Sequence, residues 1–152
     1  MNSLATPILL VEDDANDVLL IQRAFRKASI PRAVHVVEDG ERALAYLSGA
    51  GPFGDREKYP IPGLVLLDLK LPRKAGLEVL DWVRKHPSAL RRLPISMLTS
   101  SRQLSDINRA YELGANSYLV KPGEFNALVD LVRSVHHYWF DFSEKPDTVG
   151  AP

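Results

Sequence analysis

Residues 8–14 read ILLVEDD, four apolar residues followed at once by three acidic ones. A short apolar run without alternation is typical of a strand that is covered on both faces. Comparable runs occur at 64–67 (LVLL), 95–98 (ISML) and 118–120 (YLV), and a less apolar one lies at 33–37 (AVHVV). We predict one strand at each of these positions.

Segments with helical spacing separate the predicted strands. Apolar residues recur at intervals of three and four within 18–28, 77–83 and 125–135, and shorter helical patterns cover 43–47 and 107–113. Strand and helix therefore alternate five times. This order predicts an α/β fold, a doubly wound parallel sheet with helices on both faces that are joined by right-handed crossovers.

Length and composition limit the classes of protein to which the chain can belong. Its 152 residues correspond to about one domain, which we place at 1–142, with a flexible polar tail at 143–152. The 19 basic and 19 acidic residues balance, so we expect no nucleic-acid partner. No apolar run is long enough to cross a bilayer, so we expect no membrane partner and a cytoplasmic location. The lack of cysteine excludes disulfides and thiolate metal sites.

Charged and hydroxyl side chains follow the predicted strands. Glu12 and Asp13 come after the first strand, Asp68 after the third, Thr99 after the fourth and Lys121 after the fifth. In an open parallel sheet, the carboxyl ends of the strands share one edge, where ligands bind. We therefore expect these side chains to meet, although they are far apart in sequence.

This set of residues suits phosphoryl chemistry. Clustered carboxylates repel one another unless a cation binds or a pKa rises, and Mg²⁺ accepts one or two carboxylates together with carbonyl and phosphate oxygens. Asp68 could then act as a nucleophile that forms an acyl phosphate. Thr99 and Lys121 could each bind a phosphoryl oxygen.

Four motifs occur along the chain in the order LLVEDD (9–14), LLDLKLP (66–72), MLTSS (97–101) and GANSYLVKP (114–122). Taken together, they resemble the receiver domain of two-component response regulators. The resemblance covers residues 7–138. It implies a flavodoxin-like single domain with the sheet order 2-1-3-4-5, and a phosphoacceptor for signalling rather than an enzyme.

The resemblance also implies the roles of individual residues. Asp68 would be the phosphoacceptor, and the Mg²⁺ ligands would be Asp13, Asp68 and the backbone carbonyl of Lys70, with Glu12 acting through water. The phosphohistidine would belong to a partner, a sensor histidine kinase. A cis peptide bond usually precedes the proline that corresponds to Pro122.

The family's conformational switch maps onto two further positions. In the family, a hydroxyl such as that of Thr99 moves toward the new phosphoryl group, and an aromatic ring at the position of Tyr118 turns inward. The sequence contains no DNA-reading module after the receiver motifs. We therefore expect the output to be a protein–protein contact.

A second resemblance, to one group within this family, comes from the connecting segments and the C-terminal segment. The insertion at 49–63, the entry RRLP at 91–94 and the aromatic C-terminal segment are similar to those of the small stand-alone regulators that are paired with bacterial and cyanobacterial phytochromes. This similarity implies a phytochrome-type histidine kinase as the partner.

The aromatic residues near the C-terminus allow two interpretations. Tyr138, Trp139 and Phe142 lie beyond the stripe of the last helix that faces the core, and large exposed apolar patches usually mark interfaces. A symmetric homodimer would be the simplest use of such a surface. Alternatively, these side chains cover the core beside the N-terminal segment.

Three other functions are weighed against a phosphorylated receiver. A dehalogenase-like hydrolase also uses Asp, Mg²⁺, Thr or Ser, and Lys, but its nucleophile follows the first strand and has an acid two residues on, whereas Asp68 follows the third strand and is followed by Leu69 and Lys70. A flavin-binding domain would have hydroxyl residues where the acidic residues 12–14 stand. A scaffold that needs no phosphate would not require the complete set of acids, Thr and Lys.

Overall fold

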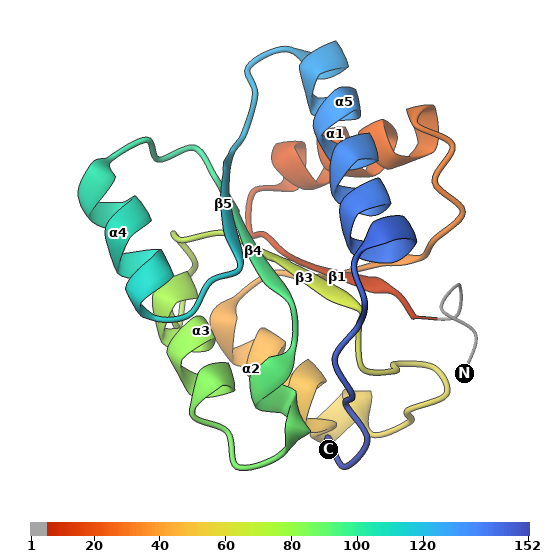
Figure 1. Ribbon diagram of the computed structural model, residues 1–152, viewed down its shortest axis with the longest axis vertical. Helices are drawn as coiled ribbons and strands as arrows, with labels where there is room; N and C mark the ends of the chain where they lie inside the picture. Colours follow the sequence, from red (N-terminus) through yellow and green to blue (C-terminus); the bar gives the residue numbers. More distant parts are fainter. Residues whose placement is uncertain (1–5) are drawn as a thin grey trace.

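The computed structural model describes residues 6–152, and this part of the chain forms alternating strands and helices (Figure 1). The strands are β1 (Ile8–Val11), β2 (Val34–Val37), β3 (Leu64–Leu67), β4 (Ile95–Thr99) and β5 (Ser117–Val120). The α-helices are α1 (Ala15–Lys27), α2 (Gly40–Ser48), α3 (Gly76–Arg84), α4 (Leu104–Glu112) and α5 (Phe125–His136). Shorter helical segments are the 3₁₀ helices η2 (Gly51–Phe53) and η3 (Ala89–Arg92) and the π-helical η4 (His137–Phe142). The five strands and the five α-helices lie where the sequence patterns predict them, with ends that differ by a few residues.

The strands form one parallel sheet in the order β2-β1-β3-β4-β5, which confirms the order that the resemblance implies. The central strands β1, β3 and β4 are buried along their whole length, whereas the edge strands β2 and β5 are mostly half-buried. Because every strand runs in the same direction, the carboxyl ends of the strands lie along one edge of the sheet. Residues 1–5, the start of the domain predicted at 1–142, lie outside the described residues.

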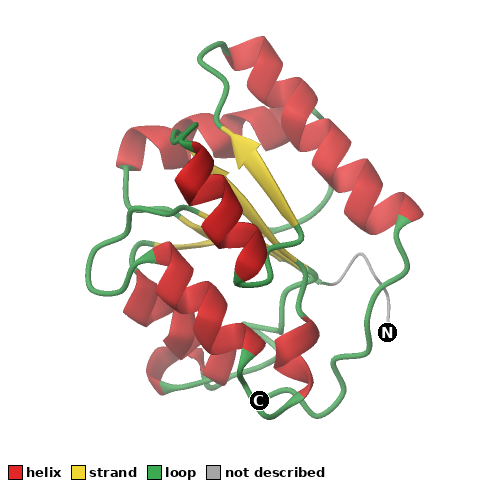
Figure 2. Cartoon of the chain, turned by 60° about the vertical axis from the view of Figure 1, so that its left-hand side comes forward, coloured by secondary structure: helices red, strands yellow, loops and turns green. Residues whose placement is uncertain are grey.

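Helices cover both faces of the sheet, with α1 and α5 on one face and α2, α3 and α4 on the other (Figures 1 and 2). Successive residues of a strand point to opposite faces. Leu9 and Val11 of β1 therefore join the core beneath α2 and α3, whereas Ile8 and Leu10 join the core beneath α1 and α5. This double burial explains why the central strands are apolar at every position. Within residues 6–152, no helix has the length and apolar character needed to cross a bilayer.

The long connection before β3 folds around one arginine. The Arg56 guanidinium donates hydrogen bonds to the backbone carbonyls of Tyr46 at 2.8 Å, Leu47 at 2.7 Å and Tyr59 at 3.1 Å. Tyr46 and Leu47 lie in the last turn of α2, where carbonyls lack partners within the helix. The connection is thus fastened to the end of α2.

The C-terminal tail, residues 143–152, runs from the end of η4 back toward the end of α2 (Figure 1). Two arginine side chains contact its backbone. Nη2 of Arg92 donates to the carbonyl of Asp147 at 2.8 Å, and Nε of Arg56 donates to the carbonyl of Pro152 at 2.9 Å. The flexibility that the sequence predicts for the tail stays a prediction.

Candidate functional site

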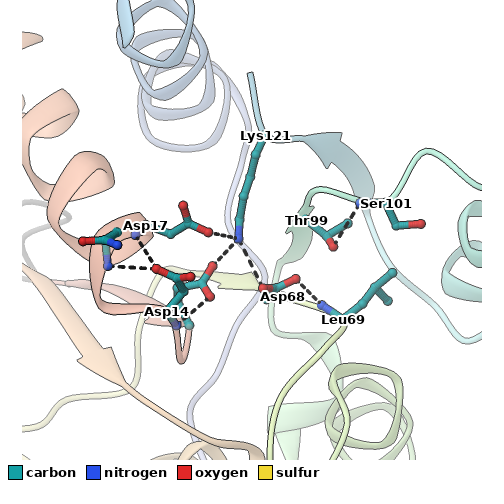
Figure 3. Close-up of polar contacts among 9 residues, drawn as sticks. Asp14, Asp17, Asp68, Leu69, Thr99, Ser101 and Lys121 are labelled. Carbon is teal, nitrogen blue, oxygen red and sulfur yellow. Dashed lines mark hydrogen bonds and ion pairs between the residues drawn. The ribbon is translucent and has the colours of Figure 1, made fainter. Parts of the chain in front are cut away.

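Polar side chains at the carboxyl edge of the sheet line a cavity of about 490 Å³. Figure 3 shows the polar contacts among several of them. The walls of the cavity include acidic residues that follow β1 and β3, the hydroxyl residue that ends β4 and the lysine that follows β5. These residues are Glu12, Asp13, Asp68, Thr99 and Lys121, and Lys70 lines the same cavity. The structure therefore brings together the residues for which the sequence analysis expected roles in phosphoryl and metal binding.

Backbone hydrogen bonds beyond the strand ends fix the positions of these side chains. The amide of Glu12 donates to the carbonyl of Val37 at 3.1 Å, and the amide of Asp68 donates to the carbonyl of Val11 at 3.1 Å. The amide of Lys121 donates to the carbonyl of Thr99 at 2.8 Å. Glu12, Asp68 and Lys121 thus continue the hydrogen-bonding pattern of the sheet by one residue beyond the strand ends.

The ammonium of Lys121 is the central charge of the site. It forms ion pairs with Glu12, with Oδ2 of Asp17 at 2.9 Å and with Oδ2 of Asp68 at 3.2 Å. The lysine side chain is only 11% exposed. One cation therefore holds three carboxylates that would otherwise repel one another in a partly desolvated place.

Burial and ion pairing shift the pKa values of this site in opposite directions. Burial raises the pKa of Glu12 to about 7, the nearby Asp68 adds to the rise, and the hydrogen bond from Lys121 opposes it. Burial alone would lower the pKa of Lys121, but the hydrogen bonds to Glu12 and Asp17 outweigh burial and raise it above the ordinary value. The lysine therefore remains charged at neutral pH.

The carboxylates have the composition of a site for a hard divalent cation. Glu12, Asp13 and Asp68 each offer an oxygen, and these oxygens lie within 4.8 Å of one another. Asp13 is exposed and thus accessible from solvent. A set of carboxylate oxygens with room for water fits Mg²⁺. Such a cation would supply positive charge opposite the oxygens of an incoming phosphoryl group.

The expected switch residues lie on two adjacent strands. Thr99, at the end of β4, is 2% exposed, and its side chain borders the cavity. The hydroxyl of Tyr118, on β5, donates to the backbone carbonyl of Ser101 at 3.0 Å. The ring is therefore linked to the loop that begins directly after Thr99.

The sequence analysis missed one member of the site. Asp17 lies in the first turn of α1, and its carboxylate reaches Lys121. Asp14 caps the same helix, since its side chain accepts hydrogen bonds from the amides of Asn16 at 2.8 Å and Asp17 at 3.1 Å. An acid in the first turn of a helix is common, because the helix dipole favours negative charge there, so the sequence held no signal that set Asp17 apart.

One expectation about the backbone is wrong. The peptide bond between Lys121 and Pro122 is trans, not cis. The trans form is the more stable form of most bonds that precede proline. Lys121 reaches the carboxylates from this trans backbone.

The aromatic residues of η4 differ in exposure. Tyr138 is 58% exposed and Phe142 is 78% exposed. Trp139 and Phe140 instead pack against the core beneath α1 and α5. The two interpretations of this segment therefore apply to different residues: Trp139 covers the core, and Tyr138 and Phe142 leave apolar surface in solvent.

Comparison with known proteins places these features in a family. Residues 8–133 match the family model of the response regulator receiver domain. The chain is 37% identical to response regulator Rcp1 of Synechocystis sp. over 134 residues, which are 88% of each chain. It resembles the crystal structure of the phosphorylated cyanobacterial phytochrome response regulator RcpA, with 35% identity and a TM-score of 0.84 over 93% of this chain and 99% of that one. The Mn²⁺-bound form of Rcp1 matches with 35% identity and a TM-score of 0.81 over the same shares.

Proposed function

The chain belongs to the response regulator receiver domain family, and from this premise we propose that Asp68 accepts a phosphoryl group from a histidine kinase. The observation that carries the proposal is the position of the Asp68 carboxylate, which contacts the Lys121 ammonium and lies within 4.8 Å of oxygens of the acidic residues after β1. Asp68 is 7% exposed, and its Oδ1 accepts a hydrogen bond from the amide of Leu69 at 2.7 Å. One carboxylate oxygen is thus held, while Oδ2 faces the lysine.

The proposed step is a direct transfer between two side chains. An oxygen of Asp68 forms a bond to phosphorus as the bond between phosphorus and the kinase histidine nitrogen breaks, and that nitrogen takes up a proton. Thr99 donates a hydrogen bond to one phosphoryl oxygen, and Lys121 donates to another. Positioning and charge neutralisation account for most of what such a transfer needs.

The proposal includes Mg²⁺ as the cofactor. Asp13, Asp68 and the backbone carbonyl of Lys70 would hold it, with Glu12 acting through water. Support comes from the carboxylate oxygens that lie within 4.8 Å of one another and from the Mn²⁺-bound form of the related Rcp1. Because receiver domains are signalling domains, we propose that the same site serves the transfer of the phosphoryl group to Asp68 and its later loss from Asp68. It does not turn over an external substrate.

The proposed partner is a phytochrome-type histidine kinase in the cytoplasm. The related RcpA is a cyanobacterial phytochrome response regulator, and 93% of this chain aligns with it. The proposed output is a protein–protein contact switched through Thr99 and Tyr118. The exposed side chains of Tyr138 and Phe142 provide the apolar surface for a homodimer.

A phosphotransfer assay tests the proposal. With Mg²⁺ and acetyl phosphate as donor, the wild-type protein should gain one phosphoryl group by intact-mass analysis, and Asp68→Asn should gain none. Asp55→Asn is the matched control, because Asp55 is an exposed acid in the connection before β3. Phosphorylation of Asp68→Asn to the wild-type extent would refute the assignment.

The hydrolase alternative is not favoured. The nucleophile candidate follows β3 rather than β1, and residues 8–133 match the receiver family. Multiple turnover of a generic phosphate ester by the wild-type protein would reverse this judgement.

A further inference from the structure

Lys121 has one partner that is not among the proposed ligands of the metal or the phosphoryl group. Its Nζ is 2.9 Å from Oδ2 of Asp17, which is closer than the 3.2 Å to Oδ2 of Asp68. Figure 3 shows the two carboxylates approaching the ammonium from different sides. Asp17 belongs to α1, whereas Asp68 follows β3. The lysine is therefore held between a helix and the sheet.

All hydrogen-bonding capacity of the ammonium is in use. An ammonium has three donors, and Lys121 has three carboxylate partners, Glu12, Asp17 and Asp68. Two of these, Glu12 and Asp68, are also among the residues whose oxygens could hold a divalent cation, whereas Asp17 is not. The lysine and a cation therefore compete for the first two carboxylates, and Asp17 binds only the lysine.

The position of Asp17 is built into the start of α1. Asp14 caps the helix and accepts a hydrogen bond from the amide of Asp17 at 3.1 Å. The side chain of Asp17 is 35% exposed, so its charge costs less desolvation than that of Glu12, which is 1% exposed. Asp17 thus reaches the ammonium from the rim of the site and can serve as its anchor on α1.

From this arrangement we infer that Asp17 is a positioning residue, which takes up one of the three ammonium donors of Lys121 and so weakens the competition of the lysine with the cation for Glu12 and Asp68. The inference rests on the proposed function, because it assigns a role within the same phosphoryl site. Without Asp17, the ammonium would rely on Glu12 and Asp68 alone. It would then oppose cation binding more strongly, since like charges compete for the same oxygens.

The test compares two variants that remove the same charge from neighbouring positions. Asp17→Asn should raise the Mg²⁺ dissociation constant about tenfold, because Asp17 is in direct contact with Lys121 and contacting residues are typically coupled by an energy of this size. Asp14→Asn is the control, since the structure gives the Asp14 side chain only helix-capping contacts and asparagine can also cap a helix. Its long-range charge effect should be about twofold. Isothermal titration calorimetry with MgCl₂ measures both.

A double-mutant cycle separates positioning from simple loss of charge. In a Lys121→Met background, Asp17→Asn should change Mg²⁺ affinity no more than Asp14→Asn does, because there is no ammonium left to position. The ¹⁵Nζ resonance of Lys121 should also shift in Asp17→Asn and not in Asp14→Asn.

Two results would overturn the inference alone. One is an equal effect of Asp17→Asn and Asp14→Asn in the presence of Lys121, and the other is an undiminished tenfold effect of Asp17→Asn after Lys121 has been replaced. A wild-type protein that binds no Mg²⁺ and accepts no phosphoryl group would overturn the proposed function and the inference together.

Discussion

Nζ of Lys121 lies 3.2 Å from Oδ2 of Asp68, although the strands that carry them, β5 and β3, are separated by β4. The lysine therefore extends across the end of the intervening strand. Both side chains are about one-tenth exposed, at 11% and 10%. An ion pair in such a place is screened less by water than a surface pair, so we expect the lysine to contribute to folding in addition to the role proposed for it in phosphoryl binding.

The first prediction concerns the loss of this cation. Lys121→Met should lower the free energy of unfolding by about 2 kcal/mol in metal-free buffer, because three carboxylates lose their shared partner in a partly buried place. Mg²⁺ should recover most of the loss. Urea unfolding with and without MgCl₂ measures both effects.

The matched control for this variant is Lys85→Met. Lys85 pairs with Asp81 at 3.0 Å, but its side chain is 75% exposed. Exposed pairs contribute little, so the change should stay within about 0.5 kcal/mol. Equal losses for Lys121→Met and Lys85→Met would contradict the buried-charge argument.

The second prediction concerns metal binding by Asp13. A ligand present at 100 times its dissociation constant stabilises the native state by about 2.7 kcal/mol, and Mg²⁺ should stabilise the wild-type protein in this way. Asp13→Asn should remove the stabilisation, while leaving the metal-free protein at least as stable, because one repelling charge is gone. Thermal unfolding at increasing MgCl₂ measures the shift. A shift in Asp13→Asn as large as that of the wild type would exclude Asp13 as a ligand.

Much of the fold was predictable because the relevant signals are local. The runs that became β1 and β3 are continuous apolar stretches, and the structure buries them on both faces. The convergence of Asp13, Asp68 and Lys121 was predictable for a different reason, since parallel strands must end at one edge. The motif resemblance to the receiver family is confirmed by the match over residues 8–133.

The parts that were not predictable depend on tertiary contacts. Asp17 looks like any acid in the first turn of a helix, where the helix dipole favours negative charge, and only the position of Lys121 reveals its second role. The expectation of a cis bond before Pro122, which came from the family resemblance, was wrong, because the bond is trans. The contacts of Arg56 and Arg92 with the tail join segments for which the sequence gives no pairing signal.

The third prediction concerns self-association through the aromatic surface. Phe142→Ser should weaken a homodimer without reducing stability, because the ring is 78% exposed. Trp139→Ser should instead destabilise the fold, since Trp139 packs against the buried core beneath α1 and α5. Sedimentation velocity together with urea unfolding distinguishes the two effects. Sedimentation of Phe142→Ser that is identical to that of the wild type across a dilution series would remove Phe142 from the interface.

The fourth prediction concerns the pH dependence of stability. Burial lowers the pKa of His35, whose Nδ1 lies 2.8 Å from the hydroxyl of Tyr46. As the pH falls, His35 of the unfolded chain binds a proton near the ordinary histidine pKa of about 6.5. His35 of the folded chain binds its proton only at a lower pH. The stability that neutral His35 contributes is therefore complete above that pH and is lost as the pH falls toward the lowered pKa.

His35→Gln should thus reduce the fall in unfolding free energy between about pH 7.5 and about pH 5.5. Burial also lowers the pKa of His136, so part of the pH dependence should remain in the variant. Urea unfolding at the two pH values measures the difference. A slope as steep as that of the wild type would show that His35 does not contribute.

The fifth prediction links a glycine to Asp68, the proposed phosphoacceptor. Gly76 begins α3, and a Cβ at this position would lie 1.9 Å from the backbone carbonyl oxygen of Asp68. Since that contact is impossible, Gly76→Ala must displace the backbone of either residue. We expect a loss of about 3 kcal/mol in the free energy of unfolding, as for overpacking in a tight core, together with weaker Mg²⁺ binding, because Asp68 moves.

Gly123→Ala provides the matched control on the other side of the site. Gly123 lies two residues after Lys121, and a Cβ there would have no neighbour within 4 Å. The same added methyl group should therefore change stability by less than about 0.5 kcal/mol and leave Mg²⁺ affinity unchanged. If Gly76→Ala matched Gly123→Ala in both measurements, the close approach of α3 would not position Asp68.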